Sequence, residues 1–283
     1  MHAPSRAQAQ TLKKNLEASG SRNPFWFCGP CVVESRDTVL AIAEKIRSIS
    51  DRLQVPMVFK ASFDKANRTS LKSFRGVGFE EALRLLSLVK QEFDLPLVTD
   101  VHETGQVDAV AEVVDIIQIP AFLCRQTDLI AKVCQSNRLV NVKKGQFLAP
   151  SNVKEIVEKL EHFEAAGFWI TERGTSFGYQ RLVVDYAGFP EMLSTGAHLV
   201  MDITHAVQLP GAAGGVAGGI RDAIPTLARA AAANGVHGFF AETHPDPAKA
   251  LSDGANAWPL DRLETLVRQV KRIAEVTAEV YQW

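Results

Sequence analysis

Eight short apolar runs, separated by amphipathic helical patterns, constrain the fold of this 283-residue chain more than any other feature. Each run has the length of a buried strand, and apolar positions recur three and four residues apart in the intervening segments. This helical pattern is clearest in residues 39–53, 82–89 and 263–274. The predicted strands are residues 25–28, 56–60, 96–100, 115–119, 139–143, 168–171, 198–203 and 237–242.

The alternation predicts a (β/α)8 TIM barrel, because eight strand–helix units in about 250 residues match that fold and right-handed crossovers close its sheet. A doubly wound open sheet is the alternative, but no GxGxxG turn follows residues 25–28. We expect one barrel domain over residues 25–283. A short polar extension, residues 1–24, precedes it, with a frayed helix around residues 11–18. The helix after residue 180 is the weakest prediction, because Gly188 and Pro190 interrupt it.

Composition excludes several classes of protein. The net charge of -1 gives no overall attraction to nucleic acid or to a membrane surface. No apolar run approaches the roughly 18 residues that a membrane span needs, and residues 1–24 lack the apolar core of a signal peptide. Four cysteines in a chain of this length are typical of a reducing compartment. We therefore expect a cytoplasmic enzyme without a nucleic-acid or membrane partner.

Cationic side chains follow the predicted strands, at the end of a TIM barrel where active sites lie. Cations that converge in one cleft repel each other unless an anion neutralises them. Arg68 offers a planar fork that matches phosphate, and Asn67 and Thr69 flank it further out on the same loop. Together these residues indicate substrates with anionic groups at two places. The four cations expected to converge are Lys60, Lys65, Lys143 and Arg173.

A second set of side chains suits a metal ion. One thiolate, one imidazole and two carboxylates favour zinc or another transition metal over magnesium or calcium. No local spacing motif joins the four residues, and Cys31 could instead be a buried small side chain. Cys28 and Cys31 also form a Cys-x-x-Cys pair, which could indicate redox chemistry or half of a zinc site, although strand alternation could turn Cys28 away. We expect Cys124 and Cys134 to be packing residues. The candidate ligands are Cys31, His205, Glu242 and Asp253.

Two further features have both a functional and a structural interpretation. His102 follows Asp100 after the third predicted strand, so it could carry a proton or be a buried structural histidine. The glycine-rich residues 211–219 follow the seventh predicted strand. They could close over a substrate, cradle phosphate through backbone N–H groups, or form a plain flexible loop.

Seven motifs, spread over residues 25–260, resemble those of the 3-deoxy-D-manno-octulosonate 8-phosphate synthases. They are long and specific, and they include most of the candidate site residues. Residue 69 is a departure, because serine is common there in the family and this chain has threonine, which keeps the hydroxyl. The motifs are residues 29–35 (GPCVVES), 60–68 (KASFDKANR), 118–128 (QIPAFLCRQTD), 141–147 (NVKKGQF), 171–174 (TERG), 202–208 (DITHAVQ) and 242–247 (ETHPDP).

The resemblance implies a condensation of phosphoenolpyruvate with D-arabinose 5-phosphate and water. The products would be phosphate and 3-deoxy-D-manno-octulosonate 8-phosphate, a lipopolysaccharide precursor. By matched position, the residues expected to hold phosphoenolpyruvate are Lys60, Lys65, Gln118, Ala121, Phe122, Lys143 and Arg173. Those expected to hold the sugar phosphate are Asn67, Arg68, Thr69 and Asp100. The expected catalytic residues are Lys60, Lys65, Asp100 and His102.

The resemblance also implies a metal and an assembly. Members of this family with asparagine at the position of Cys31 need no metal, whereas members with cysteine bind one. This chain has the cysteine, so it resembles the metal-dependent kind, with one divalent transition metal ion (Zn, Fe, Mn or Co) on the four candidate ligands. The family arginine at the position of Arg125 reaches the sugar phosphate of a neighbouring subunit, which implies a homotetramer.

Two rival functions remain open at this point. The first is the 3-deoxy-D-arabino-heptulosonate 7-phosphate synthase reaction, with erythrose 4-phosphate as the acceptor. Those enzymes typically carry Lys-Pro-Arg-Thr where this chain has Lys-Ala-Asn-Arg at residues 65–68. The second rival is a catalytically silent barrel that binds sugar phosphate as a sensor or scaffold. An intact set of cations and metal ligands argues against it.

Overall fold

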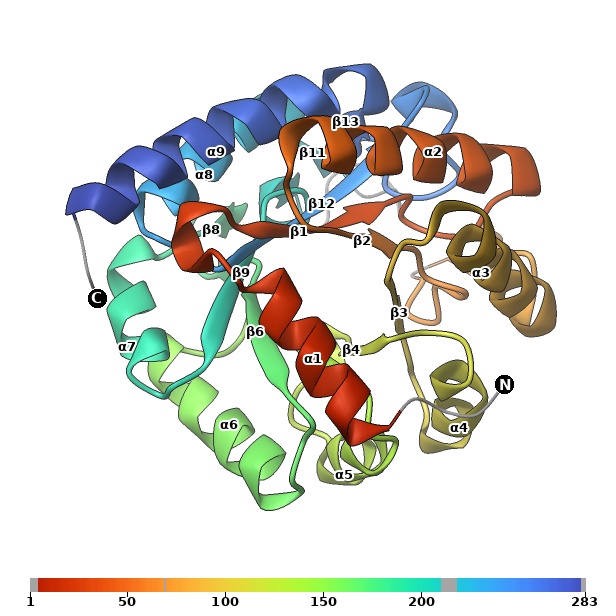
Figure 1. The fold of residues 1–283 in the computed structure, drawn as a ribbon, viewed down its shortest axis with the longest axis horizontal. Helices are drawn as coiled ribbons and strands as arrows, with labels where there is room; N and C mark the ends of the chain where they lie inside the picture. The colour runs from red at the N-terminus through yellow and green to blue at the C-terminus, as the bar shows by residue number, and fades with distance from the viewer. Residues whose placement is uncertain (1–4, 69, 210–217, 281–283) are drawn as a thin grey trace.

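The predicted strands form one closed parallel barrel in the computed structural model, which describes residues 5–68, 70–209 and 218–280 (Figure 1). β1 pairs with β12, with Phe25 opposite Gly238, and this pairing closes the sheet. The TIM barrel is therefore confirmed and the doubly wound sheet was wrong. The barrel strands are β1 (Phe25–Gly29), β2 (Met57–Lys60), β3 (Leu97–Asp100), β4 (Ile116–Ile119), β5 (Leu139–Lys143), β6 (Phe168–Glu172), β9 (His198–Asp202) and β12 (Gly238–His244).

Helices surround the barrel, as Figure 1 shows. Each of the three predicted helical faces is buried against the strands, in α2, α3 and α9. Ser35 caps α2 by accepting a hydrogen bond from the backbone N–H of Thr38 at 3.2 Å. The interrupted helix after residue 180 is short, and Pro190 lies in its first turn. The helices are α2 (Arg36–Leu53), α3 (Phe79–Phe93), α4 (Val107–Ala111), α5 (Thr127–Gln135), α6 (Val153–His162), α7 (Phe189–Leu193), α8 (Ile224–Ala233) and α9 (Leu263–Val280).

Short strands shape the loops at the carboxyl end of the barrel. β7 (Thr175–Ser176) pairs antiparallel with β8 (Leu182–Val183), and β10 (Gln208–Leu209) pairs antiparallel with β11 (Gly218–Gly219). β13 (Trp258–Pro259) extends alongside the end of β12. Thr69 and residues 210–217 lie outside the described residues, so only the last two glycines of the predicted glycine-rich loop, those in β11, are described. Among the described residues, no helix has the length and apolar character that crossing a membrane requires.

Strand alternation divides the core into two layers. Phe25 and Phe27 of β1 point into the barrel, whereas Trp26 and Cys28 pack in the outer layer between strands and helices. Cys28 therefore points away from the candidate site, and Cys31 is a separate free thiol at the strand end. This placement argues against a redox pair or half of a zinc site. Cys124 and Cys134 also lie in the outer core layer, as predicted.

The N-terminal extension differs from the frayed helix predicted around residues 11–18. The helix is α1 (Arg6–Leu16), and it begins with a capping box between Ser5 and Gln8. Figure 1 shows α1 lying across one opening of the barrel. Its apolar face, with Ala9 and Leu16, is buried against the barrel interior. A helix was predicted here, but it begins and ends earlier than expected and is held in place, because polar residues of this segment have partners far away in the sequence.

Those partners meet at Glu17, directly after α1. The indole Nε1 of Trp169 donates a hydrogen bond to Glu17 Oε1 at 2.6 Å, and His198 Nδ1 lies 2.5 Å from the same oxygen. Lys13 forms an ion pair with Glu17 Oε2 at 2.6 Å. Burial raises the pKa of Glu17, but the contacts with His198 and Lys13 outweigh burial and lower the pKa to about 2. A charged Glu17 therefore fastens α1 to the amino-terminal end of the barrel.

Candidate active site

The carboxyl ends of the barrel strands bring together a ring of polar side chains, each of them buried. All eight barrel strands contribute one residue from the strand end or the loop directly after it. Buried charges are rare unless they are paired or bind a ligand, so this ring marks the candidate active site. Its members, in strand order, are Cys31, Lys60, Asp100, Gln118, Lys143, Arg173, Asp202 and Glu242.

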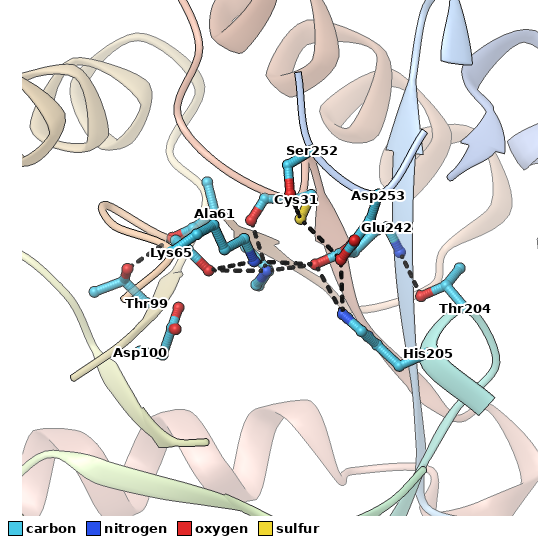
Figure 2. Close-up of polar contacts among 12 residues, drawn as sticks. Cys31, Ala61, Lys65, Thr99, Asp100, Thr204, His205, Glu242, Ser252 and Asp253 are labelled. Atoms are coloured by element: carbon cyan, nitrogen blue, oxygen red, sulfur yellow. Dashed lines mark hydrogen bonds and ion pairs between the residues drawn. The ribbon is translucent and has the colours of Figure 1, made fainter. Parts of the chain in front are cut away.

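Three of the four candidate metal ligands form a tight group on one side of this ring. Single ligand atoms of Cys31, Glu242 and Asp253 lie within 4.8 Å of one another. The fourth ligand, His205, lies beside them, with its Nε2 3.5 Å from Glu242 Oε1 and 3.8 Å from Asp253 Oδ2 (Figure 2). The four residues come from loops after β1 and β9, from β12 itself and from the loop after β12.

The chemistry of this group fits a divalent transition metal. Burial raises the pKa of the Cys31 thiol well above its usual range, and the charges of Asp253 and Glu242 raise it further. The charges of Lys65 and Lys60 lower this pKa, but they do not outweigh burial, and a bound metal cation would favour the thiolate further. The mixed sulfur, nitrogen and oxygen donors match zinc or iron-like metals better than magnesium or calcium. The structure thus brings the four candidate ligands close together.

The cations of the site are paired with carboxylates that the sequence analysis did not assign to them. Lys60 Nζ forms a buried ion pair with Glu242 Oε1 at 2.7 Å, and Lys65 Nζ lies 3.9 Å from the same oxygen. Lys143 is ion-paired with Asp202, and its Nζ lies 3.1 Å from the centroid of the Phe240 ring. Burial lowers the pKa of Lys143 to about 8, against the opposing charge of Asp202. The cations therefore converge, but carboxylates already offset part of their repulsion.

Arg173 is the cation with spare hydrogen-bonding capacity. Its Nη2 donates to Gln208 Oε1 at 2.8 Å, whereas its buried Nη1 has no partner among the described residues. Glu172 accepts hydrogen bonds from the backbone N–H groups of Arg173 and Gly174, and Lys144 holds the other Glu172 oxygen at 3.2 Å. This buried pair fixes the turn that directs Arg173 into the site. Lys144 and Glu172 lie within two of the sequence motifs, but the sequence analysis assigned them no role.

The residues predicted to hold the sugar phosphate are only partly brought together. Arg68 folds inward, where its Nη2 donates to Ser252 Oγ and its Nη1 lies 3.8 Å from Asp253. Asn67 is exposed on the same loop, and Thr69 lies outside the described residues. Ser252 Oγ also lies 2.7 Å from Cys31 Sγ, so this serine, missed in the sequence, links Arg68 to a candidate metal ligand.

Asp100 and His102 form a pair at the end of β3. His102 Nε2 lies 3.1 Å from Asp100 Oδ2. Burial lowers the pKa of His102, but the hydrogen bond and charge of Asp100 outweigh burial and raise it. Asp100 Oδ1 and His102 Nδ1 are buried, and neither has a hydrogen-bond partner in the described part of the chain. The pair therefore has one free acceptor and one free ring nitrogen.

The residues predicted after β4 divide between the centre and the rim. Gln118 is buried, and its Oε1 accepts a hydrogen bond from Asn141 Nδ2 at 3.1 Å. Phe122 is 56% exposed, and the Arg125 side chain is also exposed. Within the described residues, no hydrogen bond or ion pair joins Arg125 to the central ring. Ala121 begins the short turn that carries Phe122.

Comparison with known proteins identifies the family. Residues 9–279 match the DAHP synthetase I family. The chain belongs to the DAHP synthetase I family. A relative from Stenotrophomonas maltophilia (strain R551-3), named 2-dehydro-3-deoxyphosphooctonate aldolase, is 53% identical over 253 residues, which are 89% of this chain and 92% of that protein. Relatives of the same name from Xanthomonas oryzae pv. oryzae (strain PXO99A) and Xanthomonas campestris pv. campestris (strain B100) are 52% and 51% identical over the same shares.

Membership of the DAHP synthetase I family agrees with the resemblance seen in the sequence motifs. The rival heptulosonate reaction is that of related DAHP synthases, so the family as a whole does not separate the two acceptors. The similar proteins are named for an octonate, which is an acid of eight carbons.

Proposed function

We propose that this DAHP synthetase I family enzyme condenses phosphoenolpyruvate with D-arabinose 5-phosphate and water. The products are 3-deoxy-D-manno-octulosonate 8-phosphate, a lipopolysaccharide precursor, and phosphate. The observation that carries the proposal is the similarity to 2-dehydro-3-deoxyphosphooctonate aldolases over 89% of the chain, at up to 53% identity. The geometry supports it, since the buried ring of polar side chains, with Lys60, Lys143 and Arg173 among them, lies where TIM barrels carry their active sites.

The cations would bind the two anionic groups of phosphoenolpyruvate. Lys60 and Lys65 share the carboxylate of Glu242, whereas Lys143 pairs with Asp202. Preorganised cations in a cleft shielded from water stabilise charge that develops as C3 of phosphoenolpyruvate attacks an aldehyde. Gln118 and the backbone at residues 121–122 would complete this half of the site.

The sugar phosphate would bind on the other half, near Asn67, Arg68 and Thr69. To reach its phosphate, Arg68 would exchange its contact with Ser252 for a charge-assisted, bidentate one. Asp100 would hold the sugar hydroxyls, and His102, whose pKa it raises, is placed to carry a proton.

A divalent transition metal (Zn, Fe, Mn or Co) on Cys31, His205, Glu242 and Asp253 would supply Lewis-acid chemistry, polarising either the aldehyde oxygen or a water molecule. The donor types support this proposal, and so does Asp202, which accepts a hydrogen bond at His205 Nδ1 and leaves Nε2 towards the other ligands. We further propose that the enzyme is a cytoplasmic homotetramer in which the exposed Arg125 completes a neighbouring site.

Phosphate release tests this function directly. The enzyme, supplied with metal, should release phosphate from phosphoenolpyruvate when D-arabinose 5-phosphate is present. Lys65→Ala should be inactive. Lys154→Ala should be as active as the wild type, because the Lys154 side chain is 71% exposed and forms a surface ion pair with Glu158. Faster release with erythrose 4-phosphate would favour the heptulosonate reaction. Binding of phosphoenolpyruvate and D-arabinose 5-phosphate without any release of inorganic phosphate would favour the catalytically silent barrel.

A further inference from the structure

Asp202, at the end of β9, contacts Lys143 as well as the candidate metal ligand His205. It is fully buried, and its two oxygens accept five hydrogen bonds. Oδ1 accepts three of them, from Thr204 N at 3.1 Å, Thr204 Oγ1 at 3.1 Å and His205 N at 2.9 Å. These three bonds fix the orientation of the carboxylate. Oδ2 must therefore face the two remaining donors, His205 Nδ1 and Lys143 Nζ.

Those two donors belong to different halves of the site. His205 Nδ1 lies 2.7 Å from Asp202 Oδ2, so His205 carries its proton there and directs the Nε2 lone pair towards Glu242 and Asp253. Lys143 forms its buried ion pair with the same oxygen. One oxygen atom thus joins a candidate metal ligand to a candidate phosphoenolpyruvate-binding cation.

We propose that Asp202 is a positioning residue that couples anion binding at Lys143 to metal binding at His205. An acceptor on the outer nitrogen of a ligating histidine fixes its tautomer and raises its basicity. Lys143 competes for that acceptor. When the anion of phosphoenolpyruvate draws Lys143 away, Asp202 becomes a stronger acceptor for His205 Nδ1–H, and His205 becomes a better ligand. The coupling is reciprocal, so metal binding also makes Lys143 more available to the anion.

This inference rests on the proposed function, because it takes Lys143 as a phosphoenolpyruvate-binding residue. The experiment measures metal affinity instead of turnover. Metal-stripped enzyme is titrated with Co²⁺ against a chromogenic chelator under reducing conditions, with and without phosphoenolpyruvate. We expect phosphoenolpyruvate to tighten Co²⁺ binding by about fivefold or more in the wild type.

Asp202→Asn tests the route of the coupling. The three donors that contact Oδ1 would hold the amide oxygen in that position. The amide NH₂ would then face His205 Nδ1 and Lys143 Nζ, which are donors themselves, so it could accept from neither. We expect Co²⁺ affinity to fall about 10- to 100-fold, and the effect of phosphoenolpyruvate to fall below about twofold. The matched control is Asp115→Asn. Asp115 also pairs with a lysine, Lys90 at 2.6 Å, and accepts a backbone N–H, but it precedes β4 at the opposite end of the barrel. Asp115→Asn should keep the wild-type affinity for Co²⁺ and the wild-type effect of phosphoenolpyruvate on that affinity.

Asp202→Asn leaves Lys143 buried without its carboxylate partner, so this variant could fail to fold. A second pair of variants, which also removes the charge of Lys143, covers that case. Lys143→Met is compared with Lys143→Met carrying Asp202→Asn, both without phosphoenolpyruvate. The second variant should bind Co²⁺ about 10- to 100-fold more weakly than the first. Equal Co²⁺ affinities of these two variants would overturn the proposal. So would an Asp202→Asn variant in which phosphoenolpyruvate still tightens Co²⁺ binding as it does in the wild type. A wild type that releases phosphate as proposed, but whose Co²⁺ affinity does not change with phosphoenolpyruvate, would refute the coupling and leave the proposed function standing. A wild type that shows neither phosphate release nor a phosphoenolpyruvate effect would refute the proposed function.

Discussion

The stacked histidines at the amino-terminal end of the barrel should make the fold sensitive to acid. The His198 and His237 rings lie 4.0 Å apart at an interplanar angle of 5°, with Lys13 and Glu17 nearby. His237 Nδ1 accepts a hydrogen bond from the backbone N–H of Leu199 at 3.3 Å. Burial, together with the charge of His198, lowers the pKa of His237 from 6.5 to about 4. Protonation of His237 is therefore unfavourable in the folded protein.

The size and sign of the effect follow from this difference. In the unfolded chain His237 takes up its proton near pH 6.5, but in the folded protein it does so only near pH 4. Between these values the unfolded chain binds more protons, so the free energy of unfolding falls as the pH falls. The loss is about 3 kcal/mol, at about 1.4 kcal/mol per pH unit. The contribution of neutral His237 to the free energy of unfolding is therefore complete above pH 6.5 and lost by about pH 4.

His237→Gln tests this reasoning, because the glutamine carbonyl can still accept the Leu199 N–H but cannot titrate. Urea unfolding is measured at pH values between 6.5 and 4, and the free energy of unfolding is plotted against pH. The slope should be shallower in the variant than in the wild type by about one proton. His162→Gln is the control, since His162 is exposed and should keep the wild-type slope. Parallel plots for His237→Gln and the wild type would refute the assignment.

Three further predictions concern the active site. Chelation should abolish activity, and Mn, Co, Fe or Zn should restore part of it. Cys31→Ser should sharply weaken metal binding, whereas Cys28→Ser should barely change it. Equal losses of metal binding in the two variants would contradict the assigned ligand set. Arg68→Ala should raise the KM for arabinose 5-phosphate about ten- to a hundredfold, since a lost charged hydrogen bond removes about 1.5–3 kcal/mol; an equal rise in the phosphoenolpyruvate KM would count against this role. Mixed oligomers of inactive Arg125→Ala and inactive Lys65→Ala chains should regain activity if sites are shared between subunits, and hetero-oligomers that stay inactive would argue that they are not.

The barrel and most of its site could be predicted because they depend on patterns that are local in the sequence. Each apolar run predicts a strand, and the fold then places every strand end at one face. Cys31 and Asp253 lie far apart in the sequence, yet both follow strands of one closed sheet, so their meeting needs no further information.

Pairings inside the site could not be predicted in this way. Lys60 of β2 meets Glu242 of β12 across 182 residues. This contact depends on which side chains point inward when β1 pairs with β2 on one side and β12 on the other. The contact of Lys143 with Asp202 similarly depends on how far β5 and β9 extend. Helix α1 was misjudged because Lys13 and Glu17 are typical surface residues in sequence, and only the closed barrel presents Trp169 and His198 to them.

The way in which α1 covers the barrel opening has a consequence for synthesis on the ribosome. Glu17 is separated from Trp169 by 152 residues and from His198 by 181. At about 5–20 residues per second, the partners of this helix are made roughly 10–35 s after the helix itself. During that time α1 has no barrel to pack against, and its apolar face stays exposed. Helix α1 is thus made before the barrel but docks only after most of it, and its docking reports that β6 and β9 have joined the sheet.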